Sequence, residues 1–136
     1  MNSPEIIVAK AFIAAVNGHD LAQLGQLMAN DHTFIDPAGR IQSGRDTMLA
    51  GWKGYLQMFP DFKIEMQNAV ADKNVVAVFG SISQTYNGKR GLVAANKITM
   101  PAAWQVVVEN GKIKSWQVYA DWTEGCKIMA EDQESA

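Results

Sequence analysis

Apolar side chains recur every three or four positions through the first part of the chain, which predicts three helices. The first begins at Ser3-Pro4-Glu5, because Ser is a preferred N-cap and Pro a preferred first helical residue, and it ends at Gly18. The second begins at Asp20, and the third follows Ser43, which we interpret as its N-cap, and ends at Pro60. We expect residues 33–36 to form a short strand between the second and third helices.

From Phe62 onward the period changes from helical spacing to alternation, which predicts strands at 62–70, 75–86, 98–109 and 112–122. Gly80 indicates a bulge or bend in the second of these strands. Asn110-Gly111 is a strong signal for a two-residue hairpin turn between the last two. Helices and strands that are segregated along the chain predict an α+β fold, with the helices on one face of a curved sheet.

The hairpin turn also predicts a register, in which Glu109 pairs with Lys112 and Trp104 with Gln117. In that register both faces of the hairpin carry apolar residues, so both faces need to be covered. The helices or a cavity would cover one face. A second copy of the chain is the simplest cover for the other, and we therefore predict a homodimer through the sheet face.

The length of 136 residues predicts a single domain. We place that domain at residues 1–122. Residues 123–136 are acidic and weakly patterned, and we expect them to form a C-terminal tail with at most one helical turn.

The composition excludes several classes of protein. A chain with 48% hydrophobic and 19% charged residues is not a disordered protein. A net charge of −2 without a Lys/Arg cluster argues against a nucleic-acid or membrane-surface partner. The apolar runs are too short to span a bilayer, and Met1 to Glu5 lacks the positive region of a signal peptide. We therefore expect a cytoplasmic protein.

The sequence offers few metal ligands. Cys126 is the single cysteine, so no intrachain disulfide is possible, and the spacing of Cys126, His19 and His32 matches no zinc motif. We predict no metal and no cofactor. His19 and His32 lie beside acids at predicted turns, where we expect them to be exposed, and neither is predicted to be a catalytic base.

Asp36 is the most conspicuous polar residue, because it ends an apolar strand immediately before the turn Pro37-Ala38-Gly39. One interpretation is that its carboxylate caps this turn by accepting hydrogen bonds from nearby backbone N–H groups. The other is that it points into a cavity as an acid/base group with a raised pKa. The residues alone leave both open. Asp121 is similarly either a strand-end cap or a second acid.

Residues 3–122 resemble the cone-shaped fold shared by nuclear transport factor 2, the SnoaL-like polyketide cyclases, limonene epoxide hydrolase and bacterial ketosteroid isomerase. The residues that carry this resemblance are Ala14-Ala15-Val16-Asn17, His19-Asp20-Leu21, Thr33 to Gly39, Ser43-Gly44, and Gly111-Lys112-Ile113 followed by Trp116. The resemblance implies an NTF2-like cone, with three N-terminal helices packed on a strongly curved, mostly antiparallel sheet. A fold of this kind hosts enzymes and binding modules alike.

The resemblance also places some of the chemistry. The general base of the isomerase, an Asp in an Asp-Pro-x-Gly turn, falls on Asp36. Its two oxyanion donors fall on Phe12 and on Ala103 or Trp104, so both donors of the isomerase are missing, and losing one such donor costs roughly 10²–10³ in rate.

The other relatives fit less well. The predicted strand 75–86 lacks the Arg and Asp pair of the epoxide hydrolase, and Val118 takes the place of its last-strand acid. Gln117 stands where the cyclases have an Asp.

We therefore predict a pocket for a small hydrophobic molecule. Asp36 is the candidate general base for isomerase, cyclase or hydrolase chemistry, and Asp121 is a second candidate. The alternative is a non-catalytic ligand-binding or dimerisation module of the same fold, in which Asp36 is structural. The residues predicted to line the pocket are Phe12, Trp52, Tyr55, Trp104, Trp116 and Val118.

Overall fold

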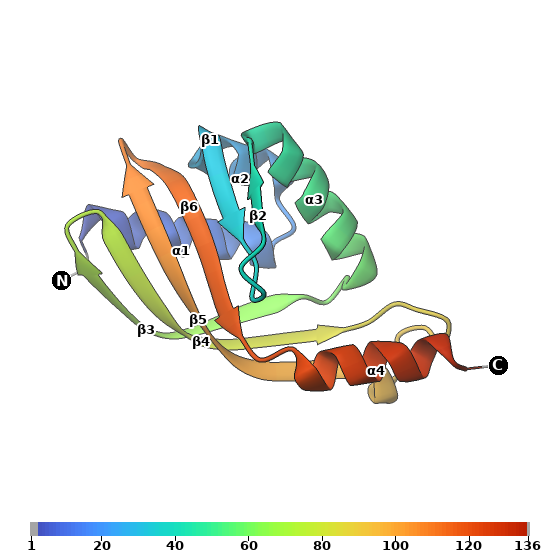
Figure 1. The fold of residues 1–136 in the computed structure, drawn as a ribbon. Coiled ribbons are helices and arrows are strands. Elements are labelled where there is room, and N and C mark those ends of the chain that lie inside the picture. Colours follow the sequence, from blue (N-terminus) through green and yellow to red (C-terminus); the bar gives the residue numbers. More distant parts are fainter. Residues whose placement is uncertain (1–2, 136) are drawn as a thin grey trace.

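A computed structural model describes residues 3–135 (Figure 1). The helices are α1 (Pro4–Asn17), α2 (Leu21–Leu27), α3 (Arg45–Met58) and α4 (Thr123–Gln133), with a short 3-10 helix, η1 (Ala94–Asn96). The strands are β1 (Met28–Ile35), β2 (Ile41–Ser43), β3 (Lys63–Asp72), β4 (Val75–Thr85), β5 (Lys97–Glu109) and β6 (Lys112–Ala120).

The strands form one six-stranded sheet in the order β2-β1-β6-β5-β4-β3. All neighbours are antiparallel except β1 and β6, which are parallel. The predicted α+β architecture, a curved and mostly antiparallel sheet with helices packed on it, is confirmed. Figure 1 shows the long strands bending, with α4 beside the far ends of β4 and β5 and apart from α1 and α2.

Two of the three predicted helix starts are as expected. The Ser3 hydroxyl accepts a hydrogen bond from the Ile6 N–H (3.1 Å), and the Asp20 carboxylate accepts one from the Gln23 N–H (3.0 Å). The third prediction was wrong: Ser43 belongs to β2, and the N-cap of α3 is Gly44, with φ of 103° and no side-chain cap. The pairing of β2 with β1 takes Ser43 into the sheet.

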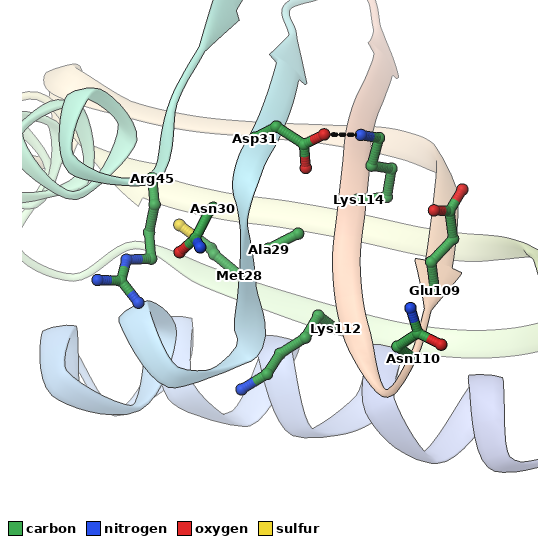
Figure 2. A pocket seen from close by; sticks show the side chains of 9 residues that line it. All are labelled: Met28, Ala29, Asn30, Asp31, Arg45, Glu109, Asn110, Lys112 and Lys114. Atoms are coloured by element: carbon green, nitrogen blue, oxygen red, sulfur yellow. Dashed lines mark hydrogen bonds and ion pairs between the residues drawn. The ribbon is translucent and has the colours of Figure 1, made fainter.

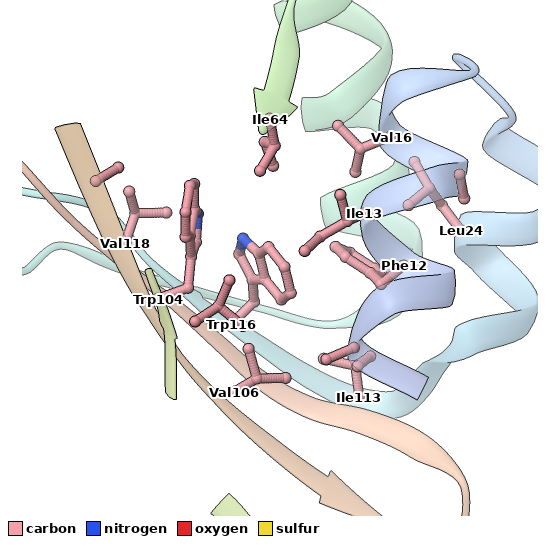
Figure 3. Packing of buried hydrophobic residues seen from close by; sticks show 14 of the residues in the cluster. Phe12, Ile13, Val16, Leu24, Ile64, Trp104, Val106, Ile113, Trp116 and Val118 are labelled. Carbon is pink, nitrogen blue, oxygen red and sulfur yellow. The ribbon is translucent and has the colours of Figure 1, made fainter. Parts of the chain in front are cut away.

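The hydrophobic core lies between α1, α2 and α3 and the inward face of the sheet (Figure 3). Phe12 and Val16 of α1, Leu24 of α2, and Val106 and Trp116 of the hairpin are fully buried there. Figure 3 shows the α1 side chains pointing toward the hairpin side chains. The helical spacing that predicted α1 and α2 therefore also identified their buried faces.

The predicted hairpin register was wrong beyond the turn. Glu109 does pair with Lys112, and Val108 with Ile113, but Val107 pairs with Ser115, so that Lys114 bulges out of the ladder. A bulge places one extra residue on one strand and reverses the faces of the residues after it. Trp104 therefore pairs with Val118 rather than Gln117.

This correction changes the two faces of the hairpin. The inward face now carries Trp104, Val106, Trp116 and Val118, all of which are buried. The Lys114 ammonium at the bulge pairs with the Asp31 carboxylate.

The expectation that His32 is exposed at a turn was also wrong. β1 begins at Met28, and His32 is fully buried with its Nδ1 2.9 Å from the Ile113 carbonyl oxygen. Parallel pairing of β1 with β6 takes this segment into the sheet, although the register shifts between Met28 and Thr33. Burial is the main cause that holds the pKa of His32 below its usual value. His19 is exposed in the loop after α1, with φ of 54°.

The C-terminal segment differs from the predicted tail. Residues 123–133 form α4, an eleven-residue helix in which Gly125 and Asp132 are buried. The Asp132 carboxylate accepts hydrogen bonds from the N–H groups of Lys89 and Arg90, each at 2.8 Å, and from Asn96 Nδ2 at 2.9 Å. We call these four residues the Asp132 clasp. The clasp ties α4 to the loop between β4 and β5.

No helix within residues 3–135 is both long enough and apolar enough to cross a membrane. Across the same residues, no group of three or more His, Cys, Asp and Glu side chains is arranged to hold a metal ion.

Candidate functional site

A pocket of about 530 Å³ lies between α3, the inward face of the sheet and α4. Ligand pockets in proteins are commonly about 300–1,000 Å³, so this one has the size for a small molecule. Its walls are mostly apolar and aromatic. The lining residues from α3 and the sheet are Phe34, Gln42, Met48, Gly51, Trp52, Tyr55, Met58, Ile64, Ile82, Trp104, Trp116 and Val118.

The α3 wall is a group of interlocked aromatic rings. The Trp52 and Tyr55 ring centroids are 6.1 Å apart and edge-on at 77°, and the Tyr55 and Phe62 centroids are 5.2 Å apart at 89°. Edge-to-face packing of this kind restrains each ring. The pocket therefore has a pre-formed wall in the absence of a ligand.

The opposite wall comes from the β5–β6 hairpin, where the rings of Trp104 and Trp116 lie with centroids 6.3 Å apart (Figure 3). The bulge at Lys114 brings these two residues to one face. Phe12 was predicted to line the pocket, and the structure places it differently. It is fully buried on α1 with its centroid 4.6 Å from that of Trp116, and it is not among the lining residues. Trp52, Tyr55 and Val118 do line the pocket.

A buried polar pair stands behind the α3 wall. The Tyr55 hydroxyl donates to Gln84 Oε1 at 2.5 Å, and Gln84 is fully buried on β4. Burial raises the pKa of Tyr55 far above its ordinary value, so the hydroxyl stays protonated. The sequence analysis missed Gln84. The sequence did contain a signal for it: Gln84 lies two residues after Ile82 in a predicted strand, so both side chains point to the same inward face.

Asp36 lies in the turn at the rim of the pocket, next to the largely exposed Arg40 side chain. One carboxylate oxygen accepts hydrogen bonds from the Ala38 and Arg40 N–H groups, both at 2.9 Å, and the other accepts one from Arg40 Nε at 3.0 Å. Desolvation raises the pKa of Asp36, but the bonds from Arg40 and Ala38 outweigh it and hold the pKa below its ordinary value.

These contacts are the ones that the turn-cap interpretation of Asp36 predicts. Asp36 nevertheless lines the pocket, as the other interpretation requires. Its role as a general base therefore stays a prediction.

Asp121 follows the end of β6 and is exposed. Its carboxylate accepts a hydrogen bond from the Thr123 N–H at 2.9 Å, and hydrogen bonding to Thr123 is the main cause that holds its pKa below the ordinary value. Asp121 is not among the residues that line the pocket. Its described contacts are those of a cap at the start of α4, and a role as an acid stays a prediction.

The third wall was missed, because residues 123–136 were expected to form a tail. Trp122, Cys126 and Met129 line the pocket from α4 and the residue before it. Their spacing of four and then three positions is helical, and this was the signal in the sequence. Phe59 and Phe62, in the loop after α3, complete the wall beside them.

A second, polar hollow of about 290 Å³ lies between β1, the start of α3 and the β5–β6 turn (Figure 2). It carries Arg45, Lys112 and Lys114 together with Asp31 and Glu109. Figure 2 shows Lys114 directed to the Asp31 carboxylate, and the Lys112 ammonium donates to the Gln26 carbonyl oxygen. Three cations thus stand against two anions, and two of the cations, Lys112 and Lys114, already have partners within the chain.

The family model for a SnoaL-like domain matches residues 9–116. No curated protein sequence matches the chain. An LEH-like epoxide hydrolase from M. tuberculosis is similar in structure, with a TM-score of 0.78, 14% identity, and coverage of 96% of this chain and 92% of that one.

Two other solved structures are comparably similar. A candidate SnoaL-like polyketide cyclase from Shewanella denitrificans has a TM-score of 0.80 and 15% identity, covering 99% of this chain and 100% of that one. A hypothetical protein with a ketosteroid isomerase-like fold from Catenulispora acidiphila, in complex with trimethylamine, has a TM-score of 0.76 and 20% identity, covering 93% and 92%. At such identities the likeness shows the fold alone.

Proposed function

We propose that this chain, which belongs to the SnoaL-like domain family, binds a small, mainly apolar molecule in the pocket between α3, the sheet and α4. The observation that carries the proposal is the aromatic lining, whose rings are already packed against one another without a ligand. Burying apolar surface there would contribute about 25 cal/mol per Å². A pre-formed wall also reduces the ordering cost of binding.

The pocket favours a ligand without a net charge. Of the described residues that line it, Asp36 and Arg40 are the charged ones, and they are paired with each other at the rim. A charged ligand in the interior would be desolvated without a counter-charge, which is costly. A neutral molecule of two or three fused rings suits both the volume and the lining.

A binding measurement with fluorene, a neutral three-ring hydrocarbon, tests this proposal. We expect fluorene to quench tryptophan fluorescence saturably, and the substitution Val118→Phe to weaken its binding by roughly tenfold or more, because the larger ring occupies the pocket. Ile7→Ala, at an exposed position of α1 outside the pocket, is the control and should bind as the unaltered chain does. Absence of saturable binding, or an equal loss in both variants, would refute the proposal.

Catalysis by Asp36 is a second candidate, and the observation that favours it is the position of its carboxylate on the pocket lining. A base must exchange its present contacts with Arg40 for a substrate, so a bound ligand should raise the pKa of Asp36. An NMR titration of the Asp36 carboxyl carbon with and without fluorenone measures this. If the pKa is unchanged by the ligand, Asp36 is a structural residue of the turn.

We also propose that the chain forms a homodimer through the outward face of the sheet. Between Val75 and Ser83 on β4, and between Thr99 and Val107 on β5, no described outward-facing side chain is charged. Phe79 is 47% exposed and Tyr119 is 50% exposed, and both pair with Ala103 in one row across this face. An uncharged face of this extent is typical of an interface.

Sedimentation tests the dimer. We expect a dimer at micromolar concentration, and a monomer after Phe79→Lys, because a charge at the centre of the face would have to be desolvated. A monomer in the unaltered chain would contradict the proposal.

A further inference from the structure

The α4 wall of the pocket buries less apolar surface than the α3 wall. Helix α3 has three buried side chains, which are Met48, Trp52 and Leu56. The buried residues of α4 are Gly125 and Asp132, and its larger apolar side chains are at most partly buried. Segments that bury little apolar surface are the ones that open locally at the lowest free energy. Of these two helices, α4 is therefore the one that is easier to displace.

The two ends of α4 are attached in different ways. At the start, the Trp122 ring packs edge-on against Phe59, with centroids 6.2 Å apart at 65°, and it also lies against Gly125. Apart from bonds to its neighbours in sequence, the hydrogen bonds that join α4 to other parts of residues 3–135 all end on residues 86–96. Figure 1 shows α4 lying along the far ends of β4 and β5. Its start is thus held by apolar packing, and its end by polar contacts with one loop.

The Asp132 clasp at that end leaves two buried polar atoms unsatisfied. Asn96 Nδ2 donates to Asp132 Oδ1 and to the carbonyl oxygens of Tyr86 and Gly91, which fixes the orientation of the amide and leaves Asn96 Oδ1 without a partner. Arg90 Nε is also buried without a hydrogen bond, 3.5 Å from Asp132 Oδ1. A buried polar group without a partner costs free energy, which is recovered when water reaches it. The clasp is therefore specific in its contacts and also releasable.

We propose that α4 is a hinged wall, which rotates about Trp122 when the Asp132 clasp releases, and that the bound molecule enters and leaves through the opening. This inference rests on the proposed function, because it requires that the pocket bind a small molecule. Asp121 and Trp122 belong to neither β6 nor α4, and residues at the ends of elements commonly absorb hinge rotations. Cys126 and Met129, which line the pocket, lie between the hinge and the clasp. Rotation would remove this wall and leave the other two in place.

The rim of the pocket at Asp36 and Arg40 is the competing route. The Arg40 side chain is largely exposed there. Trp104 and Trp116 also line the pocket but are nearly completely buried, so a three-ring molecule reaches them only if part of a wall moves. The Asp36 turn is closed by its own hydrogen bonds, whereas α4 depends on one loop. These contacts favour α4 as the part that moves.

A disulfide that can be formed and reduced tests the hinge. A β-carbon on Gly88 would lie 2.7 Å from Asp132 Cγ, so cysteines at these two positions are close enough to bond. In Gly88→Cys with Asp132→Cys, made in a Cys126→Ser chain, oxidation fixes the end of α4 and reduction leaves it without the clasp. Stopped-flow quenching of tryptophan fluorescence by fluorene should give association and dissociation rate constants roughly tenfold lower in the oxidised form than in the reduced form. Cys126→Ser alone, under the same oxidant and reductant, is the control and should show equal rates.

Hydrogen exchange provides a second measurement in the unaltered chain. We expect the amides of residues 126–133 to exchange through an opening whose free energy is lower than that of β5 and depends only weakly on denaturant. Saturating fluorene should slow this exchange, because the bound molecule would pack against Cys126 and Met129. If the disulfide variant does not fold, this measurement decides whether α4 opens.

Three results would overturn the inference. Equal rates in the oxidised and reduced forms, with fluorene still bound, would show that the molecule passes elsewhere, such as the Asp36 rim, and would leave the binding function in place. Amides of α4 that exchange only with global unfolding would show that the helix does not open. Failure of the unaltered chain to bind fluorene would refute the proposed function and the role of α4 in ligand exchange together.

Discussion

Asp36 and Asp132 make nearly the same set of contacts in two different regions of the molecule. Each carboxylate accepts hydrogen bonds from two backbone N–H groups of one loop, and each faces an arginine. For Asp36 the arginine is Arg40, with Nε at 3.0 Å, and for Asp132 it is Arg90, with Nε at 3.5 Å. In both cases desolvation raises the pKa and the hydrogen bonds outweigh it, so that both pKa values lie below the ordinary one.

The two sites differ in sequence separation and in burial. The partners of Asp36 lie two and four residues away, and its side chain is 27% exposed. The backbone partners of Asp132 lie 43 and 42 residues away, and its side chain is completely buried. The same chemistry therefore organises a local turn in one place and holds two distant segments together in the other.

This difference bears on the pocket. Asp132 does not line it, but the clasp holds the helix that presents Cys126 and Met129 to it. Asp36 does line the pocket, yet its contacts are confined to its own turn. A residue outside the pocket thus holds the helix that forms one of its walls, whereas the carboxylate at the rim bonds only within its own turn.

The largest expected effect is that of Asp132→Ala. The change leaves the Lys89 and Arg90 N–H groups and the Asn96 amide without their acceptor, so we expect Tm to fall by roughly 5–10 °C. Amide hydrogen exchange of residues 123–133 should accelerate more than that of β5. Glu131→Ala, at the exposed neighbouring position, is the control and should change little. Unchanged exchange in α4 would show that the clasp does not hold this helix.

A smaller loss is expected from Gly88→Ala. A β-carbon at Gly88 would collide with the Asp132 carboxylate and the Tyr86 ring, so the loop would have to move away from α4. Because both changes act on one contact network, Gly88→Ala combined with Asp132→Ala should destabilise by less than the sum of the two.

Gly54→Ala on α3 is the matched control. No neighbour lies within 4 Å of its β-carbon, and we expect it to stabilise the chain by about 1 kcal/mol. If calorimetry shows that the stability losses of Gly88→Ala and Asp132→Ala add fully, Gly88 acts independently of the clasp.

Acid should distinguish the two carboxylates further. A folded-state pKa below the unfolded value of about 3.9 means that the folded chain binds fewer protons. The stability from Asp36 and Asp132 is therefore present above about pH 4 and is lost as the pH falls through their folded-state pKa values.

Urea unfolding between pH 5 and pH 2 measures this loss. In Asp132→Asn the free energy of unfolding should depend less steeply on pH in this range than it does in Asp36→Asn, because the clasp is the more buried site. The lowered pKa of His32 causes a separate loss that begins below about pH 6.5, and it is common to all variants. If both variants reduce the pH dependence of the free energy of unfolding equally, the two carboxylates do not differ in their contribution to acid stability.

The smallest effect is expected for Asp36→Asn. Asn can keep the acceptor for the Ala38 and Arg40 N–H groups, and the lost ion pair involves an exposed arginine, so we expect a loss of less than about 1 kcal/mol. Chemical denaturation measures it, with Arg40→Gln as the matched variant from the other side of the pair. A loss as large as that from Asp132→Ala would overturn the comparison.

The parts of the protein that the sequence predicted depend on neighbours a few residues apart. The caps at Ser3 and Asp20, the Asn110-Gly111 turn and the Asp36 turn all involve partners within four positions. The helical and alternating patterns identified which segments are helices and which are strands, and hence the α+β fold, because each kind of element has its own period of apolar residues.

The tertiary structure alone decided the rest. Lys114 bulges where Asp31 of a parallel strand lies beside it, His32 is buried because β1 pairs with β6, and α4 is held by a loop about forty residues before it in the chain. The Tyr55–Gln84 pair and the unpartnered indoles of the pocket depend in the same way on which elements come to lie together. Such contacts join residues far apart along the chain, and no local pattern encodes which distant groups will meet.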